Sequence, residues 1–201
     1  GGRTNGTLGV ANLGNYDIFL AKYNLSGTPL GVVQFGSNAE DKPFHVHVES
    51  NEVYVSYEAN ASSMSAAFQG GSTDGTLSKF NAFLGHLWTT HVGTSGIDFV
   101  NGAAFSGDNI VISGSTNDAF SGFTNQGSFD VFVQAVSKST GAAQWTLQWG
   151  DSLVDFGWGI ASDASGNIFS MGPTQNSLYD TNSGSFDAFV TKISAEGIEQ
   201  Q

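Results

Sequence analysis

The chain of 201 residues contains no cysteine, only three prolines and only six lysine or arginine residues. The lack of cysteine excludes disulfide bonds and thiolate metal sites. Against eighteen acidic residues, the few basic ones leave a formal net charge of −12 at pH 7. A chain this acidic repels phosphate backbones and anionic membrane surfaces, so we expect no nucleic-acid partner.

Long apolar runs are also missing. No stretch approaches the roughly 18 apolar residues of a membrane span, so we expect no membrane insertion. The sequence has neither an initiator methionine nor a signal-peptide pattern, and we expect a processed product or a fragment of a longer protein.

Glycine and phenylalanine are abundant, with 27 and 16 residues. Only 12% of the residues are charged, about half the usual share of a globular domain. Many glycines, aromatic residues and β-branched residues with few charges indicate an all-β protein with tight turns. The same composition excludes a disordered chain, which would need high charge and few aromatic residues.

Four segments share one pattern, which is centred on an aspartate. These aspartates follow one another at intervals of 57, 56 and 57 residues, and other residues keep the same step. Independent markers with one period of about 57 residues predict a repeat protein. The repeated positions are Asp17, Asp74, Asp130 and Asp187; Gly36, Gly93 and Gly150; and Asp41, Asp98 and Asp155.

Each period has room for four short strands, which we letter A to D. Strand C contains the first aspartate, and both of its faces are mostly apolar: Ile18 and Leu20 point to one side, Phe19 and Ala21 to the other. A sheet with two apolar faces is sandwiched between neighbours. Four-stranded antiparallel sheets stacked face to face are the blades of a β-propeller, whereas the rungs of a parallel β-helix are much shorter than this period.

Three segments, residues 187–192, 159–167 and 2–8, resemble the bacterial seven-bladed β-propeller (SBBP-type) repeat. The resemblance covers nearly the whole chain and is weakest in the second repeat, where Gly75 and Thr76 replace an apolar pair. It implies a propeller fold, often within larger extracellular or cell-surface proteins. It implies no shared catalytic residues.

We therefore expect residues 1–201 to form a single β-propeller segment of about three to four blades. Its predicted parts are a partial blade, two whole blades and a blade that lacks its last strand: 1–36, 37–93, 94–150 and 151–201. Closed propellers have roughly four to eight blades. We expect the remainder of a parent chain, or another subunit, to complete this one.

Antiparallel strand order places the B–C links and the D–A links on one face of such a propeller. Loops on a rigid scaffold commonly carry function, so this face is the predicted ligand face. The alternative is that these loops only provide solubility and that their aromatic residues pin them to the blades. The candidate residues are Asp41, Asp98, Asp151, Asp155, Phe123, Tyr179 and Trp158.

Several carboxylates invite a chemical interpretation. Asp98 and Asp155 are weak calcium candidates, so calcium is the one cofactor considered. The aspartates of strand C recur once per unit, which favours an architectural role over catalysis.

Two further segments resemble metal sites only in part. The segment 163–167 is predicted to be a hairpin turn. His45 and His47 have no third metal ligand at a useful spacing, so we expect them to be core or channel-lining residues.

Three acceptor motifs for N-glycosylation begin at Asn5, Asn24 and Asn60. Chance alone gives about three such motifs at this content of asparagine, serine and threonine, so their number carries no information. Their placement in predicted loops is compatible with a glycoprotein.

We expect a non-catalytic binding or scaffold module of an extracellular or cell-surface assembly, which contacts protein or glycan through the B–C and D–A loops. A propeller enzyme, quinoprotein-like or glycan-cleaving, with a site at the central channel is the alternative; a purely structural repeat is a third. The segments of the inner strand A (44–48, 100–105 and 157–162) are mostly apolar or small, which favours binding over catalysis.

Overall fold

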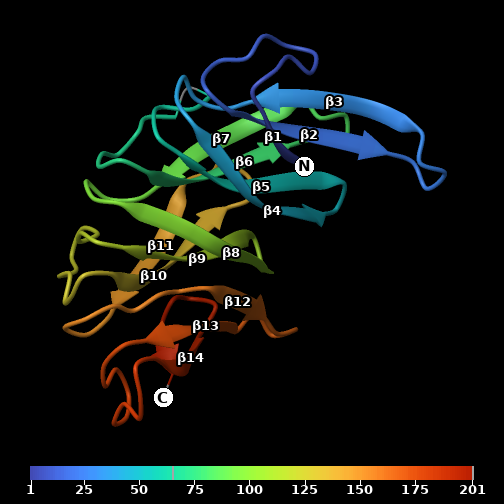
Figure 1. Cartoon of the computed structure of the whole chain (residues 1–201). Helices are drawn as coiled ribbons and strands as arrows, with labels where there is room; N and C mark the ends of the chain where they lie inside the picture. The colour runs from blue at the N-terminus through green and yellow to red at the C-terminus, as the bar shows by residue number, and fades with distance from the viewer. Residues whose placement is uncertain (65, 201) are drawn as a thin grey trace. The chain divides into compact units, whose positions relative to one another are not determined.

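A computed structural model describes residues 1–64 and 66–200, and its regular secondary structure there consists of strands alone. The strands pair antiparallel in sheets of up to four, which confirms the predicted all-β class (Figure 1). No helix capable of crossing a membrane occurs within these described residues. The chain divides into two compact units, Gly1–Val92 (unit 1) and Gly93–Gln201 (unit 2).

Unit 1 contains two sheets. In both, neighbouring strands follow one another in the chain, in the orders β1-β2-β3 and β4-β5-β6-β7. The strands are β1 (Gly2–Thr4), β2 (Asp17–Tyr23), β3 (Pro29–Phe35), β4 (Asp41–Glu49), β5 (Glu52–Ala59), β6 (Asp74–Phe80) and β7 (His86–Val92).

Unit 2 also contains two sheets, β8-β9-β10-β11 and β12-β13-β14-β15. Strand A is therefore β4, β8 or β12; strand B is β1, β5, β9 or β13; strand C is β2, β6, β10 or β14; and strand D is β3, β7, β11 or β15. The bounds are β8 (Asp98–Ser106), β9 (Asn109–Thr116), β10 (Asp130–Ser137), β11 (Ala143–Trp149), β12 (Gly159–Ser162), β13 (Ile168–Thr174), β14 (Asp187–Ile193) and β15 (Glu199–Gln200).

The last sheet differs in one detail from the prediction. The sequence predicts no strand D there, whereas the structure has a short β15 that pairs with β14 only at Lys192 and Ile193. The residues of β14 from Asp187 to Thr191 thus have β13 on one side and no described strand on the other.

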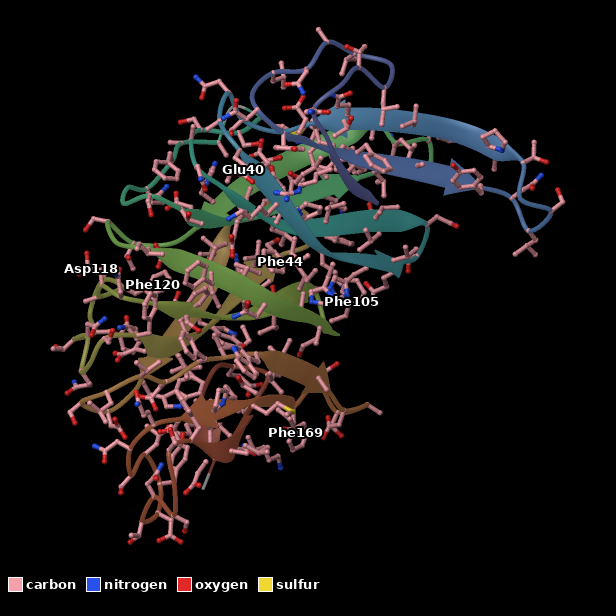
Figure 2. All side chains as sticks on the ribbon, viewed as in Figure 1. Glu40, Phe44, Phe105, Asp118, Phe120 and Phe169 are labelled. Atoms are coloured by element: carbon pink, nitrogen blue, oxygen red, sulfur yellow. The ribbon has the colours of Figure 1, made fainter. Side chains whose placement is uncertain are left out.

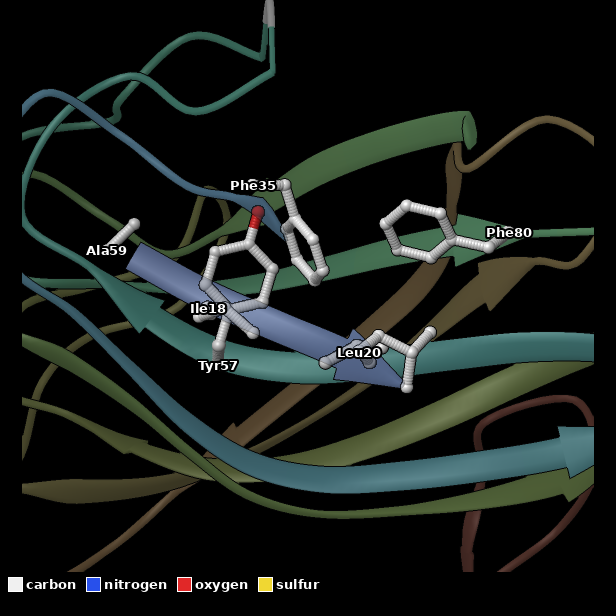
Figure 3. Packing of buried hydrophobic residues seen from close by; sticks show 7 residues of the cluster. Ile18, Leu20, Phe35, Tyr57, Ala59 and Phe80 are labelled. Atoms are coloured by element: carbon white, nitrogen blue, oxygen red, sulfur yellow. The ribbon is translucent and has the colours of Figure 1, made fainter. Parts of the chain in front are cut away.

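In unit 1 the two sheets pack through an apolar cluster (Figure 3). Ile18, Leu20 and Phe35 of the first sheet meet Tyr57 and Phe80 of the second, and the rings of Phe35 and Phe80 have centroids 4.8 Å apart. Burying side chains of this size stabilises a fold by about 1.5–3 kcal/mol each. Face-to-face packing of sheets is the arrangement that the apolar faces of strand C predict.

In unit 2 the corresponding cluster joins Val111 and Val133 of one sheet to Ile168 and Ile193 of the other. Every residue of β6, and all but the last of β10, is buried, as the two apolar faces predict. In β14, by contrast, buried and exposed side chains alternate, and Val190 is 66% exposed. One face of β14 is thus uncovered by the described residues.

The two ends of each sheet carry different connections. The A–B and C–D hairpins are short, and the A–B turn at Ser50 and Asn51 has both residues in the left-handed region, as tight two-residue hairpins require. The B–C and D–A links lie at the other end, which we call the long-loop end. In unit 2, Figure 2 shows Asp118 and Phe120 at this end and Phe105 at the opposite one.

Candidate functional site

The D–A links end in three aspartates that were predicted to lie on the ligand face. Asp41, Asp98 and Asp155 are all fully buried. Each accepts a hydrogen bond from the backbone N–H four residues earlier, at 2.7 Å, from Ser37, Thr94 and Asp151 respectively. The carboxylates thus hold the turn that leads into strand A. A macromolecular ligand does not reach them, and only a proton or a small ion has access to such a position.

Asp151 lies at the start of the same turn. Its Oδ1 accepts the N–H of Leu153 at 3.0 Å, and the residue is half-buried. It is the only one of the four predicted acidic residues that reaches the surface of the described structure. The acidic sequence of these links therefore produces little acidic surface.

The aspartates of strand C cap the B–C loops. Asp17, Asp130 and Asp187 accept the N–H four residues earlier, at 2.8, 3.0 and 2.7 Å, and Asp74 accepts the N–H of Gln69, five residues earlier, at 2.5 Å. One carboxylate does the same local task in each sheet. This is the architectural role that the once-per-unit spacing predicts.

Carboxylates of neighbouring sheets meet in pairs. Asp130 Cγ and Asp155 Oδ2 lie 2.7 and 3.1 Å from the position that a Cβ on Gly150 would occupy, and Asp41 Cγ lies 3.1 Å from the equivalent position on Gly36. Burial raises the pKa of Asp41 to about 6, and the negative charge of Asp17 acts in the same direction. Burial also raises the pKa of Asp155, with Asp151 and Asp130 adding to it.

These pairs bear on the calcium prediction. Asp17 Oδ1, Asp41 Oδ1 and Asp155 Oδ1 are buried and have no hydrogen-bond partner among the described residues. However, no group of three or more histidine, aspartate or glutamate residues in that part of the chain is arranged to hold a metal ion. A calcium ion at Asp98 or Asp155 stays a prediction.

Gly150 is required by this arrangement. A Cβ at residue 150 would contact both carboxylates, which hydrogen bonds hold in place. We expect Gly150→Ala to lower the free energy of unfolding by about 1–3 kcal/mol, as other overpacking substitutions do. Gly184→Ala is the control, because nothing lies within 4 Å of its Cβ position, and we expect a change below about 0.5 kcal/mol. Urea unfolding measures both, and equal stabilities of the two variants would contradict the steric argument.

A residue of strand D completes each capped loop, and the sequence reasoning missed it. Gln148 Nε2 donates to Asp130 Oδ2 at 3.0 Å and to Asp118 O at 3.1 Å, while its Oε1 accepts the N–H of Phe120 at 2.8 Å. Gln34 makes the same set of bonds, to Asp17 Oδ2 at 2.8 Å, to Gly6 O at 3.0 Å and from Leu8 N at 2.7 Å.

His91 holds the same position in unit 1. Its Nδ1 lies 3.3 Å from Asp74 Oδ2, and its Nε2 accepts the N–H of Ser63 at 3.2 Å. We call Gln34, His91 and Gln148 the clamp residues. They are spaced by 57 residues, so the repeat period itself carried the signal that would have identified them.

The contact between Asp74 and His91 resembles half of a catalytic triad. A general base needs a ring nitrogen that can reach a substrate proton. Here Nε2 is occupied by a backbone N–H, and the His91 side chain is fully buried. The pair therefore serves the clamp and has no access to a substrate.

His45 and His47 lie on β4 with ring centroids 5.8 Å apart. His45 is exposed and His47 is half-buried, so neither is a core residue in the described structure. Burial lowers the pKa of His47, and the neighbouring His45 acts in the same direction.

Two predicted aromatic residues lie in B–C loops of unit 2. Phe123 is half-buried and its N–H donates to Phe120 O at 2.9 Å. Tyr179 is 54% exposed, but its hydroxyl bonds Thr191 Oγ1 and Glu199 Oε1, both at 2.8 Å. Burial raises the pKa of Tyr179. The hydroxyl of Tyr179 therefore ties its loop to β14 and β15, whereas the bond of Phe123 is made by its backbone.

Trp158 has different surroundings. It ends a row of four rings in unit 2. Phe99 stacks on Phe129, with centroids 5.6 Å apart, and Phe156 stacks on Trp158, with centroids 6.3 Å apart and rings inclined by 17°. Between these pairs, the rings of Phe129 and Phe156 are tilted by 37°, with centroids 5.7 Å apart. The three phenylalanines are half-buried, whereas Trp158 is 59% exposed. Each phenylalanine flanks one of the buried aspartates, so the row runs along the long-loop end.

The segment 163–167 is a hairpin turn in the structure. Asp163 Oδ1 accepts the N–H groups of Ser165 and Asn167, and its Oδ2 accepts Asn167 Nδ2. The side chain of Asn167 lowers the pKa of Asp163. The carboxylate of Asp163 thus accepts hydrogen bonds from its own turn and stabilises it.

The glycosylation candidates differ in exposure. Asn5 and Asn24 are exposed, and Asn60 is half-buried. Asn24 Oδ1 accepts three local hydrogen bonds in the β2–β3 hairpin, and Asn60 Oδ1 accepts the hydroxyl of Thr73 at 3.0 Å. Asn5 is the one whose exposure best suits a glycan.

Neither protein-family models nor curated proteins gave a match to this chain.

Proposed function

We propose that the chain is a segment of β-propeller blades of the SBBP type and acts as a non-catalytic binding module at the cell surface or outside the cell. The long-loop end binds the ligand, and Trp158 is its central contact. A glycan is the ligand that suits this surface best; a protein partner is the second outcome that the experiment below distinguishes.

The observation that carries the proposal is the exposed indole at the end of a supported row of rings. An exposed tryptophan is costly to leave in water, whereas its flat face matches the apolar face of a sugar ring and its N–H is a hydrogen-bond donor. The stack on Phe156 fixes the ring before a ligand arrives, which reduces the entropy lost on binding.

The charge of the protein supports a neutral ligand. Stacked rings also bind the bases of single-stranded nucleic acids, but a formal net charge of −12 opposes a phosphate backbone. Neutral oligosaccharides carry no such penalty.

We expect Trp158→Ala to weaken ligand binding at least tenfold, because central aromatic contacts carry a large share of binding energy. A panel of neutral oligosaccharides identifies the probe, and titration calorimetry with the strongest binder measures the effect. Phe83→Ala is the control, because Phe83 is 92% exposed in the short β6–β7 hairpin. Two results would overturn the glycan assignment. The Trp158→Ala variant could bind the oligosaccharide with full affinity, or the wild type could bind proteins but none of the oligosaccharides.

A further inference from the structure

We propose that the clamp of unit 1 is a pH-operated switch: protonation of His91 breaks its hydrogen bond to the backbone N–H of Ser63 and releases the β5–β6 loop (residues 60–64 and 66–73) from the sheet. This inference does not rest on the proposed function, because the loop belongs to unit 1 and Trp158 to unit 2. It follows from a comparison of the three clamp residues.

The clamp position needs a donor for the strand-C carboxylate and an acceptor for a loop N–H. Gln34 and Gln148 meet both needs with one amide group: Nε2 donates to the carboxylate, while Oε1 accepts the loop N–H at 2.7 and 2.8 Å. An amide does not gain or lose a proton between pH 5 and 8, where histidine ordinarily changes its charge. The two glutamine clamps therefore hold throughout this range.

His91 meets the same two needs only as a neutral ring. Nδ1 lies 3.3 Å from Asp74 Oδ2, and Nε2 accepts the N–H of Ser63 at 3.2 Å, so the single proton of the ring is on Nδ1. A ring that gains a second proton carries a hydrogen on both nitrogens and accepts no hydrogen bond. Nε2–H and the N–H of Ser63 would then point at one another, and the acceptor half of the clamp is lost.

Burial makes this loss costly. The side chain of His91 and the whole of Ser63 are fully buried, so water cannot replace the broken bond unless the loop moves. The ring of Phe68 also packs on the His91 ring at nearly a right angle, with centroids 5.9 Å apart. The loop thus contacts the clamp ring in both of its described parts.

Charge decides which side of the clamp opens. Two carboxylates act on His91: Asp74 on β6, next to Nδ1, and Asp41 on β4, whose pKa is lowered by His91. The sequence from residue 60 to 73 contains no charged residue. A positively charged ring is therefore held by the carboxylates, and the neutral loop is the part that separates.

Two other titratable side chains reach the same loop through hydroxyl groups. Tyr57 bonds Ser63 Oγ at 2.9 Å, and a chain through Ser78 and Thr89 continues to His86 Nε2. Burial raises the pKa of Tyr57 to about 12, so this hydroxyl stays neutral. Hydroxyl groups turn to donate or to accept, so the chain adapts to a proton on His86. Only the clamp ring opposes an N–H that cannot turn.

Hydrogen exchange of the whole chain, followed by NMR for single amides, tests the switch. We expect the protection of the Ser63 amide, corrected for the intrinsic pH dependence of exchange, to fall at least about tenfold between pH 7.5 and pH 5. The amides of Leu8 and Phe120 are internal controls, because glutamines hold them. They should lose no protection.

His91→Gln installs the clamp residue of the other two sheets and should keep the Ser63 amide protected at both pH values. His86→Gln is the matched control, because it removes the other histidine of β7 and should retain the wild-type pH dependence. If His91→Gln does not fold, the nitrogen resonances of the His91 ring in the wild type decide, since the loss of protection at Ser63 must follow their titration.

Several results would each overturn the proposal. The protection of Ser63 could be independent of pH, or its loss could fail to follow the titration of the His91 ring. A pH dependence that persists in His91→Gln, or that disappears in His86→Gln, would likewise assign the effect to another group.

Discussion

Gln148→Ala is expected to lower the free energy of unfolding of unit 2 by about 2–4 kcal/mol. The substitution removes three hydrogen bonds at once, one of them to the buried carboxylate of Asp130, and leaves the N–H of Phe120 without its acceptor. Buried groups that lose a partner cost about 1–3 kcal/mol each, and more when they are charged. Urea unfolding followed by tryptophan fluorescence measures the change.

Two further variants make this result specific. Gln144→Ala lies in the same strand but is exposed, and its side chain bonds only Ala142 O, so we expect a change below about 0.5 kcal/mol. Gln148→His should recover part of the loss, because His91 makes equivalent contacts at the same register in β7. If alanine and histidine at residue 148 were equally destabilising, the side chain would act only by filling space.

The repeat period made most of the fold predictable. Markers repeated at 57 residues located the sheets, and the two apolar faces of strand C indicated that sheets pack on one another, as the cluster around Phe35 and Tyr57 shows. Such patterns are local consequences of strand geometry, in which side chains alternate between faces. Two short strands were not foreseen: β15, and β1, which takes the place of strand B in a first unit expected to have only strands C and D.

The sites were less predictable, because burial in loops depends on backbone hydrogen bonds that composition does not reveal. Asp41 and Asp155 were expected at a ligand face because they lie in acidic links. Their turns instead direct the carboxylates inward to the backbone N–H four residues earlier. The row of rings that supports Trp158 joins residues up to 59 positions apart. The repeat period relates Phe99 to Phe156, but it does not reveal that their rings lie in one row with Phe129 and Trp158.

The buried carboxylate pair in unit 1 should make stability depend on pH in an unusual direction. The pKa of Asp41 is raised from 3.8 to about 6, because burial and the charge of Asp17 outweigh the N–H of Ser37 and the opposing influence of His91. The folded state therefore binds the proton more tightly than the unfolded state. Protonation of Asp41 therefore contributes on the order of 3 kcal/mol to the free energy of unfolding. The contribution is fully present below pH 3.8 and is lost as the pH rises through about 6.

Asp41→Asn should remove this dependence and raise the free energy of unfolding at pH 7.5 by about 1–3 kcal/mol. The amide oxygen can still accept the N–H of Ser37, and the neutral amide ends the repulsion between residue 41 and the negative charge of Asp17. Urea unfolding between pH 4 and 7.5 measures the slope, with the exposed Asp108→Asn as the control. Two results together would contradict this prediction: the Asp41→Asn variant is less stable than the wild type at pH 7.5, and added calcium stabilises the wild type but not the variant. They would show that the pair holds a cation where we place a proton.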